Sequence, residues 1–286
     1  MFEQRIRDLP CFVEPLHIEP LVGGITNRNF LVHDAAGKYV ARICQPRDHL
    51  GIDRRNELVC HQAAAEFGVA PPIIEAAHEI VVTPFIVGRT LAAEDVRSAP
   101  MIDRVAERLR ALHETADRLS GEMLYFSPFQ TIRTYVKTAR HLGAELPPDV
   151  DRLLDDARTL SQRLRPYRPT LCHNDLLPAN LIDDGQKLWL VDWEYAGIGH
   201  PLFDLAGIAG NCALDAEQEQ QLLASYRGKF DPVDAQELRI LKTASLLREA
   251  LWAVLQTVSS EIEFDYVAYA RDNFAAYQQA RAQLDP

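Results

Sequence analysis

The chain of 286 residues lacks long hydrophobic runs and has few cysteines. No apolar stretch approaches the roughly 20 residues that a transmembrane helix needs. Residues 1–12 mix acids with bases, and no apolar segment follows them, so they do not resemble a secretory signal peptide. The five cysteines are scattered without a C-x-x-C spacing, which argues against a zinc site or a disulfide framework. We therefore expect a cytoplasmic protein with reduced thiols and no membrane span.

Basic residues are also scarce, with 30 Lys and Arg against 41 Asp and Glu, so the net charge is −11. Proteins that bind nucleic acids usually carry a basic excess, and we expect no nucleic-acid partner. The acidic balance suits a cationic small molecule, although an acidic surplus is also common among ordinary cytosolic proteins. The hydrophobic content of 47% is typical of a globular protein, and the length favours two lobes.

The first 90 residues read as β-rich with one helix. Their apolar patterns predict strands at 16–22, 29–33, 38–43 and 79–86 and a helix over 54–67 that ends at Gly68. The segment Val87–Thr90 is a plausible lobe boundary. We therefore expect a nucleotide-binding N-terminal lobe over residues 1–90.

The remainder, residues 91–286, reads as mostly helical. The predicted helices cover about 101–119, 129–143, 148–166, 214–227, 233–259 and 265–283. One β-rich segment over 171–197 interrupts them, with a hairpin whose strands flank the turn DDGQ. The expected class is therefore α+β: a small β-rich N-terminal lobe and a larger, mainly helical C-terminal lobe.

The β-rich segment also contains the strongest chemical motif. His173, Asp175 and Asn180 follow the pattern H-x-D-x-x-x-x-N, and Asp192 ends the second strand of the hairpin. Phosphoryl transfer needs a carboxylate that orients or deprotonates the attacking hydroxyl and oxygen ligands that hold Mg²⁺ on nucleotide phosphates. Asp and Asn also cap turns, which is the ordinary role of each residue alone. The joint pattern favours the catalytic interpretation.

Several motifs together resemble the choline/ethanolamine kinase family within the aminoglycoside phosphotransferase superfamily, whose members are relatives of protein kinases. They are GGITNRNFLV, HNDLLPANL, VDWEYAG, HPLFDLAG, ASLLREALWAVLQ and IEFDYVAYARDNFAAY, and they run from about residue 20 to 280. The resemblance implies a bilobal protein-kinase-like fold. It also implies an ATP- and Mg²⁺-dependent enzyme that phosphorylates the hydroxyl of a small cationic amino alcohol.

The resemblance assigns roles to single residues of the motif. It identifies Asp175 as the catalytic base and Asn180 and Asp192 as the magnesium ligands. Asp204 matches a buried residue that braces the catalytic loop through backbone hydrogen bonds. For His173, a packed and hydrogen-bonded loop residue is a better interpretation than a proton shuttle.

The nucleotide site is less specific in sequence. Gly23 and Gly24 form only a short motif, but glycine lets backbone N–H groups approach phosphates, and Thr26 and Asn27 add side-chain donors. A P-loop is excluded, because no G-x-x-x-x-G-K-[ST] occurs.

The phosphate-binding cation and the adenine site come from the next segments. Arg42 occupies the strand position where protein kinases have a lysine, and an arginine also grips phosphate. Glu57 is its candidate partner, with a solvated helix acid as the alternative. The adenine would lie against the hinge and hydrogen-bond to backbone at Pro84, Phe85 and Ile86.

The acceptor pocket should contain aromatic faces and carboxylates, which hold an ammonium group. Glu194, Tyr195, Trp252 and Tyr269 match positions that line the choline site in the resembling family, although the two helix aromatics also suit ordinary packing. Glu249 stands where that family commonly has a second tryptophan. A carboxylate accepts N–H hydrogen bonds, so we expect it to favour ethanolamine or another amino alcohol, or to widen selectivity.

Two alternatives remain open at the level of sequence. One is a kinase of another hydroxylated amine, such as an aminoglycoside or thiamine. The other is a catalytically inert nucleotide-binding module, which the intact Asp175, Asn180 and Asp192 disfavour. A homodimer is possible, but no pattern in the sequence requires it.

Overall fold

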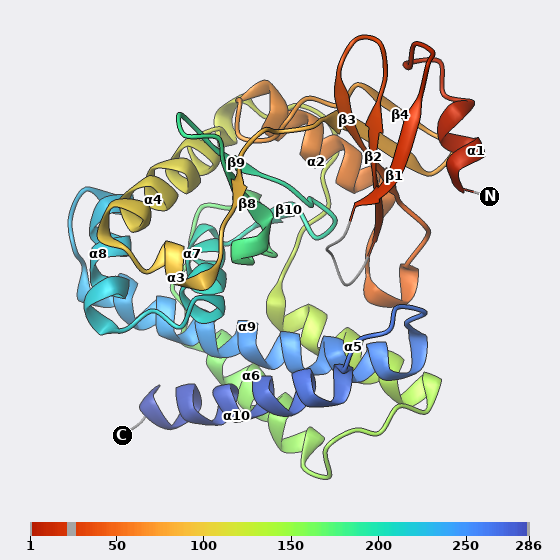
Figure 1. Cartoon of the computed structure of the whole chain (residues 1–286). Helices are drawn as coiled ribbons and strands as arrows, with labels where there is room; N and C mark the ends of the chain where they lie inside the picture. Colours follow the sequence, from red (N-terminus) through yellow and green to blue (C-terminus); the bar gives the residue numbers. More distant parts are fainter. Residues whose placement is uncertain (1, 22–26, 285–286) are drawn as a thin grey trace.

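The computed structural model describes residues 2–21 and 27–284, which form two lobes (Figure 1). The N-terminal lobe contains a five-stranded antiparallel sheet in the order β1-β2-β3-β5-β4. Its strands are β1 (His17–Leu21), β2 (Arg28–His33), β3 (Lys38–Ile43), β4 (Glu75–Ala77) and β5 (Ile80–Pro84). Four of them confirm the predicted strands, and the three-residue β4 is the one that the sequence patterns miss.

Alternating apolar residues give this sheet one buried face. Val32 of β2, Ile43 of β3 and Ile80 of β5 pack into a small core of their own. The helix α1 (Phe2–Arg7) adds Ile6 to it. Because the strand side chains alternate, the polar neighbours on β3, Arg42 among them, are left for the other face of the sheet.

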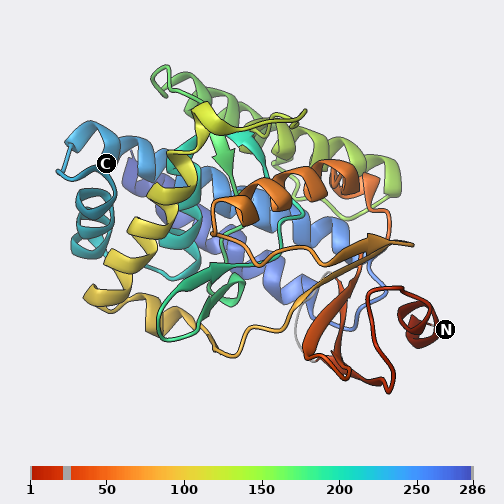
Figure 2. The same ribbon diagram turned by 90° about the horizontal axis from the view of Figure 1, so that it is seen from above.

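The helix α2 (Arg54–Glu66) connects the two lobes. It begins at Asp53, whose side chain accepts a hydrogen bond from the backbone N–H of Asn56 and so caps the helix. Its buried residues Cys60 and Ala64 pack in the larger core, with residues of the C-terminal lobe. Figure 2 shows α2 beside the helices of that lobe.

The C-terminal lobe is mainly helical, as predicted. Its longer helices are α4 (Ala99–His113), α5 (Pro128–Leu142), α6 (Val150–Gln162), α7 (Pro201–Asn211), α8 (Ala216–Arg227), α9 (Pro232–Ser259) and α10 (Tyr266–Leu284). The helices α9 and α10 run side by side in both views (Figures 1 and 2). The predicted helix over 101–119 is too long, because α4 ends at His113 and a separate 3₁₀ turn, Ala116–Arg118, follows.

No helical period in the sequence predicts α7. Nine of its 11 residues are buried, so it lacks the alternation of apolar and polar faces that marks a surface helix. It packs against α9 and carries Asp204 into the interior of the lobe.

The chain joins the C-terminal lobe at β6 (Arg89–Thr90). This strand pairs with β8 (Leu181–Asp183), which pairs with β9 (Leu188–Leu190) in the predicted hairpin. A Cβ atom at Gly88 would lie 2.7 Å from the carbonyl oxygen of Asp183, so the close approach of the two segments requires glycine. A second small sheet pairs β7 (Thr170–Cys172) with β10 (Gly197–Gly199).

The five cysteines are free thiols, and four of them are buried. Burial raises the pKa values of Cys60 and Cys212 to about 12, so these thiols stay protonated in the interior. Within residues 2–21 and 27–284, no helix is both long and apolar enough to cross a membrane.

Candidate active site

The loop that follows β7 is held by Asp204 of α7. The two carboxylate oxygens of Asp204 accept hydrogen bonds from the backbone N–H groups of His173 (2.8 Å) and Asn174 (2.7 Å). His113 of α4 lies 3.0 Å from the same carboxylate. Asp204 therefore braces the loop as expected, and the loop presents Asp175 from a fixed backbone.

His173 is a packed residue in this loop. Its imidazole Nε2 lies 2.9 Å from the carbonyl oxygen of Val191, and its ring lies 4.8 Å from that of Trp193. Burial lowers the pKa of His173, which favours the neutral imidazole. These contacts agree with a hydrogen-bonded structural histidine.

Asn180 and Asp192 meet at the end of the hairpin. The side-chain Nδ2 of Asn180 donates to the carbonyl oxygen of Asp175 (2.9 Å), so Oδ1 is the atom turned away from that contact. Val191 donates its backbone N–H to the carbonyl of Asn180 (3.0 Å), which holds the two segments together. Carboxylate and amide oxygens are the ligands that Mg²⁺ prefers, so this donor set fits the ion.

Asp192 has a left-handed backbone conformation, with φ of 66°. This conformation is uncommon for a residue with a side chain, and such positions cluster at functional sites. Its carboxylate Oδ1 lies 2.6 Å from Nη1 of Arg42 on β3. Asp192 therefore connects the hairpin of one lobe to the sheet of the other.

Arg42 also forms an ion pair with Glu57 of α2. The Glu57 side chain is 1% exposed, so the alternative of a solvated helix acid is wrong, and the structure contains the predicted pair. Arg54, one turn earlier in α2, contacts Glu57 at 2.7 Å. Sequence patterns do not single out Arg54, because an arginine in the first turn of a helix has no special signal.

The structure places Glu194 with these charges. Its Oε2 accepts hydrogen bonds from Asn27 (2.9 Å) and Arg54 (3.2 Å), and it is buried. The role of Glu194 at an ammonium site stays a prediction, and its contacts show that it also bonds to charged and polar groups of the N-terminal part of the chain. Burial raises the pKa of Glu194 to about 7, with Asp192 adding to the effect.

We call these buried charges from both lobes the interlobe cluster. It consists of Arg42, Arg54, Glu57, Asp192 and Glu194. Asn27, which the sequence assigned to nucleotide binding, lies at its edge through its bond to Glu194. Gly23, Gly24 and Thr26 lie outside the described residues.

A second buried group, the α9 cluster, consists of Asp175, Arg248, Glu249, Trp252 and Tyr269. Arg248 Nη2 lies 2.7 Å from Asp175 Oδ1 and also contacts Glu249. The hydroxyl of Tyr269, on α10, lies 3.4 Å from Glu249 Oε2, and its ring lies 6.1 Å from that of Trp252. The structure therefore brings the predicted acceptor residues of α9 and α10 together beside the predicted base.

Tyr195 also belongs to this side of the site. It is buried, and the Arg248 guanidinium carbon lies 5.2 Å from its ring centroid. Arg248 is, with Arg54, a residue of the site that the sequence patterns do not single out. The available signal was a charged pair, Arg248 and Glu249, in the middle of an otherwise apolar helical segment, since charges are rarely buried unless they are paired.

The hinge follows β5. The backbone N–H of Phe85 donates to the carbonyl of Lys38 (2.9 Å), which extends the β3–β5 pairing. Pro84 has no N–H group. Of the N–H groups at the three named positions, that of Phe85 is therefore used within the sheet and that of Ile86 is the candidate donor to adenine. Contacts of adenine with the backbone carbonyls at Pro84, Phe85 and Ile86 stay a prediction.

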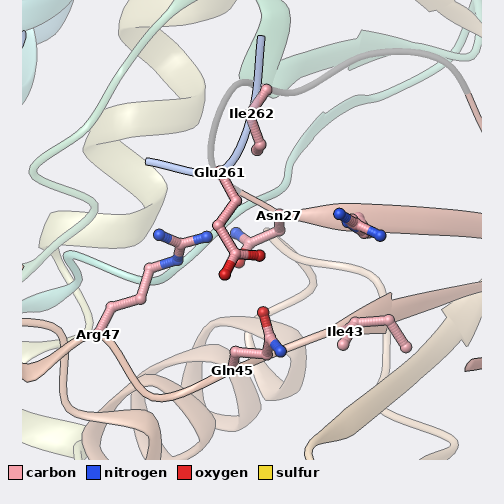
Figure 3. Close-up of a pocket in the computed structure, with 7 residues that line it drawn as sticks. Asn27, Ile43, Gln45, Arg47, Glu261 and Ile262 are labelled. Carbon is pink, nitrogen blue, oxygen red and sulfur yellow. The ribbon is translucent and has the colours of Figure 1, made fainter. Parts of the chain in front are cut away.

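A water-sized pocket of about 10 Å³ lies where the loop between α9 and α10 reaches the N-terminal lobe. In Figure 3, Glu261 of this loop projects between Arg47 and Asn27, with Gln45 beside it. Residues of the loop between α9 and α10 therefore line one edge of the region that holds Asn27.

Comparison with known proteins finds relatives that cover most of the chain. The probable ethanolamine kinase A of Dictyostelium discoideum is 28% identical over 95% of this chain and 87% of its own length. The probable choline kinase 1 of Arabidopsis thaliana is 25% identical over 93% of this chain and 87% of its own length. Both relatives therefore align with nearly the whole chain.

Solved structures are similar to this chain over nearly its whole length. A choline/ethanolamine kinase family protein from Mesorhizobium loti has a TM-score of 0.80 at 28% identity, covering 98% of this chain and 95% of its own. The choline kinase LicA from Streptococcus pneumoniae has a TM-score of 0.81 at 24% identity, covering 99% and 98%. The two-lobed arrangement is thus the protein-kinase-like fold that the sequence predicted. The model of the phosphotransferase enzyme family matches residues 17–239, and the chain belongs to that family.

Proposed function

We propose that this phosphotransferase uses ATP to phosphorylate the hydroxyl of a small cationic amino alcohol of the choline or ethanolamine type. The observation that carries the proposal is the composition of the α9 cluster. A carboxylate placed to receive a hydroxyl proton, Asp175, lies in one buried group with Glu249, Trp252 and Tyr269. Aromatic faces and a carboxylate are the groups that bind an ammonium ion.

In the proposed reaction, the acceptor hydroxyl oxygen attacks the γ-phosphorus of ATP in line, and ADP leaves as the new O–P bond forms. Asp175 takes the hydroxyl proton. Burial raises the pKa of Asp175 to about 7, Arg248 opposes this rise, and Glu249 adds to it. A base whose pKa lies near the working pH is well matched to this proton transfer.

The interlobe cluster would serve the nucleotide. Arg42 is fixed between Glu57 and Asp192, and its guanidinium suits the negative charge of phosphate oxygens. Asn180 and Asp192 would hold Mg²⁺, which neutralises phosphate charge when it is bound. Gly23, Gly24 and Thr26 stay proposed contacts of the phosphates, on the evidence of sequence alone.

Glu249 should decide between related acceptors. A primary ammonium donates N–H hydrogen bonds, and a carboxylate accepts them. A quaternary ammonium has no N–H group and depends on aromatic faces, of which Trp252 and Tyr269 remain here. We therefore propose that ethanolamine, or another amino alcohol with an N–H group, is a better acceptor than choline.

The test is ATP consumption over a panel of ethanolamine, choline, thiamine and aminoglycosides, followed by kcat/KM for the active acceptors. We expect the two small amino alcohols to be active, ethanolamine the better one. Glu249→Trp should shift the ratio of kcat/KM for ethanolamine to kcat/KM for choline in favour of choline. Glu249→Gln, which keeps the size of the side chain, should bring this ratio closer to one. Turnover of an aminoglycoside or thiamine alone would contradict the proposal. A strong choline preference that Glu249→Trp leaves unchanged would contradict the role of Glu249.

A further inference from the structure

Arg248 is the one cation of the α9 cluster, and a single nitrogen atom of its guanidinium contacts both carboxylates. Nη2 lies 2.7 Å from Asp175 Oδ1 and is also bonded to Glu249 Oε1. We propose that Arg248 is a positioning residue that holds these two carboxylates at a fixed, short separation and thereby sets the length of acceptor that can be phosphorylated. The inference rests on the proposed function, because it assumes that the hydroxyl meets Asp175 and the ammonium meets Glu249.

The separation follows from hydrogen-bond lengths. Two oxygens that both bond to one nitrogen lie within about 6 Å of each other, since each bond is about 3 Å long. The acceptor must therefore reach from one carboxylate to the other with a short spacer between its hydroxyl and its ammonium. A two-carbon spacer is short enough to lie between two carboxylates at this separation, and we expect each added carbon to make simultaneous contact with both less favourable.

The position of Arg248 is itself fixed. Its side chain is 3% exposed, and the guanidinium lies over the ring of Tyr195, with 5.2 Å from Cζ to the ring centroid. A planar guanidinium that stacks on an aromatic ring has a defined orientation, which a flexible ammonium would lack. Burial alone would lower the pKa of Arg248, but the Glu249 and Asp175 carboxylates raise it well above its usual value, so the group stays charged.

The arginine also has capacity that the two carboxylates do not use. Its Nε, which is buried, has no hydrogen-bond partner among the described residues. An arginine kept only for stability would be expected to use its buried donors within the fold, because an unmet buried donor is costly. The unpartnered Nε is therefore a donor that a bound acceptor could use.

The test compares acceptors of two lengths, ethanolamine and 3-amino-1-propanol, in the wild type and in Arg248→Met. A matched control is Arg104→Met, which removes a second arginine of the same lobe whose carboxylate partner, Asp183, lies at the end of β8 and outside both clusters. We expect the wild type to prefer ethanolamine. In Arg248→Met, kcat should fall about 100-fold because the base is misplaced, and the preference for the shorter acceptor should largely disappear. The KM for ATP should stay unchanged.

Arg248→Lys keeps the charge and one nitrogen that can reach both carboxylates, so it should recover part of kcat and part of the length preference. If Arg248 had only a structural role, its loss would lower the amount of folded enzyme and reduce the rates with both acceptors equally. Arg104→Met should have no effect beyond this. An unchanged ratio of kcat/KM for the two acceptors in Arg248→Met and in Arg248→Lys would overturn the inference.

Failure of the proposed function and failure of this inference give different experimental results. If the wild type phosphorylates no amino alcohol, the proposed function fails, and Arg248 is then tested by ATP hydrolysis with water as the acceptor. Arg248→Met should lower that hydrolysis while nucleotide binding, measured by titration, stays the same. Equal hydrolysis by the wild type and Arg248→Met would overturn the positioning role by itself.

Discussion

The interlobe cluster and the α9 cluster share one electrostatic property and differ in their surroundings. The first contains two arginines, Arg42 and Arg54, against three carboxylates, and the second contains Arg248 against two carboxylates. Each therefore has one carboxylate more than it has arginines. In each, burial raises the pKa of one carboxyl to about 7, that of Glu194 in the first and that of Asp175 in the second.

The surroundings decide which cation can supply the missing charge. The interlobe cluster joins β3 and α2 of one lobe to the hairpin of the other and offers oxygen ligands, which suit a metal ion that arrives with nucleotide phosphates. The α9 cluster lies within one lobe and has aromatic walls, Trp252 and Tyr269, which suit an organic ammonium. Under the proposed function, the same excess of one carboxylate would therefore attract a different cation in each cluster.

The largest effect should come from Asp175→Asn, in the α9 cluster. The amide cannot take the hydroxyl proton, so we expect kcat to fall at least about 1,000-fold while the fold and ATP binding are kept. Steady-state kinetics and nucleotide titration on the same preparation measure both quantities. A near-wild-type kcat would show that Asp175 is not the catalytic base and would contradict the proposed function of the α9 cluster.

The next largest effect concerns pH. Asp175 must be ionised to accept a proton, and its pKa is raised to about 7, so activity should be full above this pH and decline below it. At saturating ATP we expect kcat to fall about tenfold for each pH unit below 7. The residual kcat of Asp175→Asn should not show this decline below pH 7. A wild-type kcat that stays constant down to pH 5.5 would contradict the assignment.

A third prediction isolates the interlobe cluster. Glu57→Gln leaves Arg42 without its buried partner, so we expect the KM for ATP to rise about tenfold and the KM for the amino alcohol to change little. Glu66→Gln, at an exposed position on the same helix, is the control and should change neither constant. If Glu57→Gln raised both constants alike, the two clusters would not divide the substrates between them.

The smallest effect should come from Tyr269→Phe. The variant keeps the aromatic wall and removes only a hydroxyl that lies 3.4 Å from Glu249, so the loss should be that of one weak hydrogen bond. We expect the KM for ethanolamine to rise about threefold and the KM for ATP to stay constant. Tyr269→Ala, which also removes the ring, should have the larger effect; equal effects would show that the ring does not contribute.

Sequence reasoning predicted the parts of the site that depend on short motifs and on side-chain alternation. The pairing of Arg42 with Glu57 was predicted from the strand cation and helix acid that protein kinases pair, and the structure contains this ion pair. The partners of Glu194, which are Asn27 and Arg54, were not predicted, because both lie far from it in the sequence.

The residues that the sequence missed are those whose role depends on long-range contacts. Arg248 is 73 residues from Asp175, and no local pattern connects the two. Arg54 is 140 residues from Glu194. The helix α7 was missed for a related reason. It is buried on nearly all sides, so its apolar residues do not recur with a helical period, although its motif residue Asp204 was recognised.

The most direct test of the central claim is to follow ADP and phosphorylated acceptor together, with ethanolamine, ATP and Mg²⁺ as substrates. The account predicts that the wild type forms phosphoethanolamine and ADP in equal amounts, with the product identified by its mass, and that Asp175→Asn forms neither at a comparable rate. Formation of ADP without phosphorylated ethanolamine or choline would contradict it.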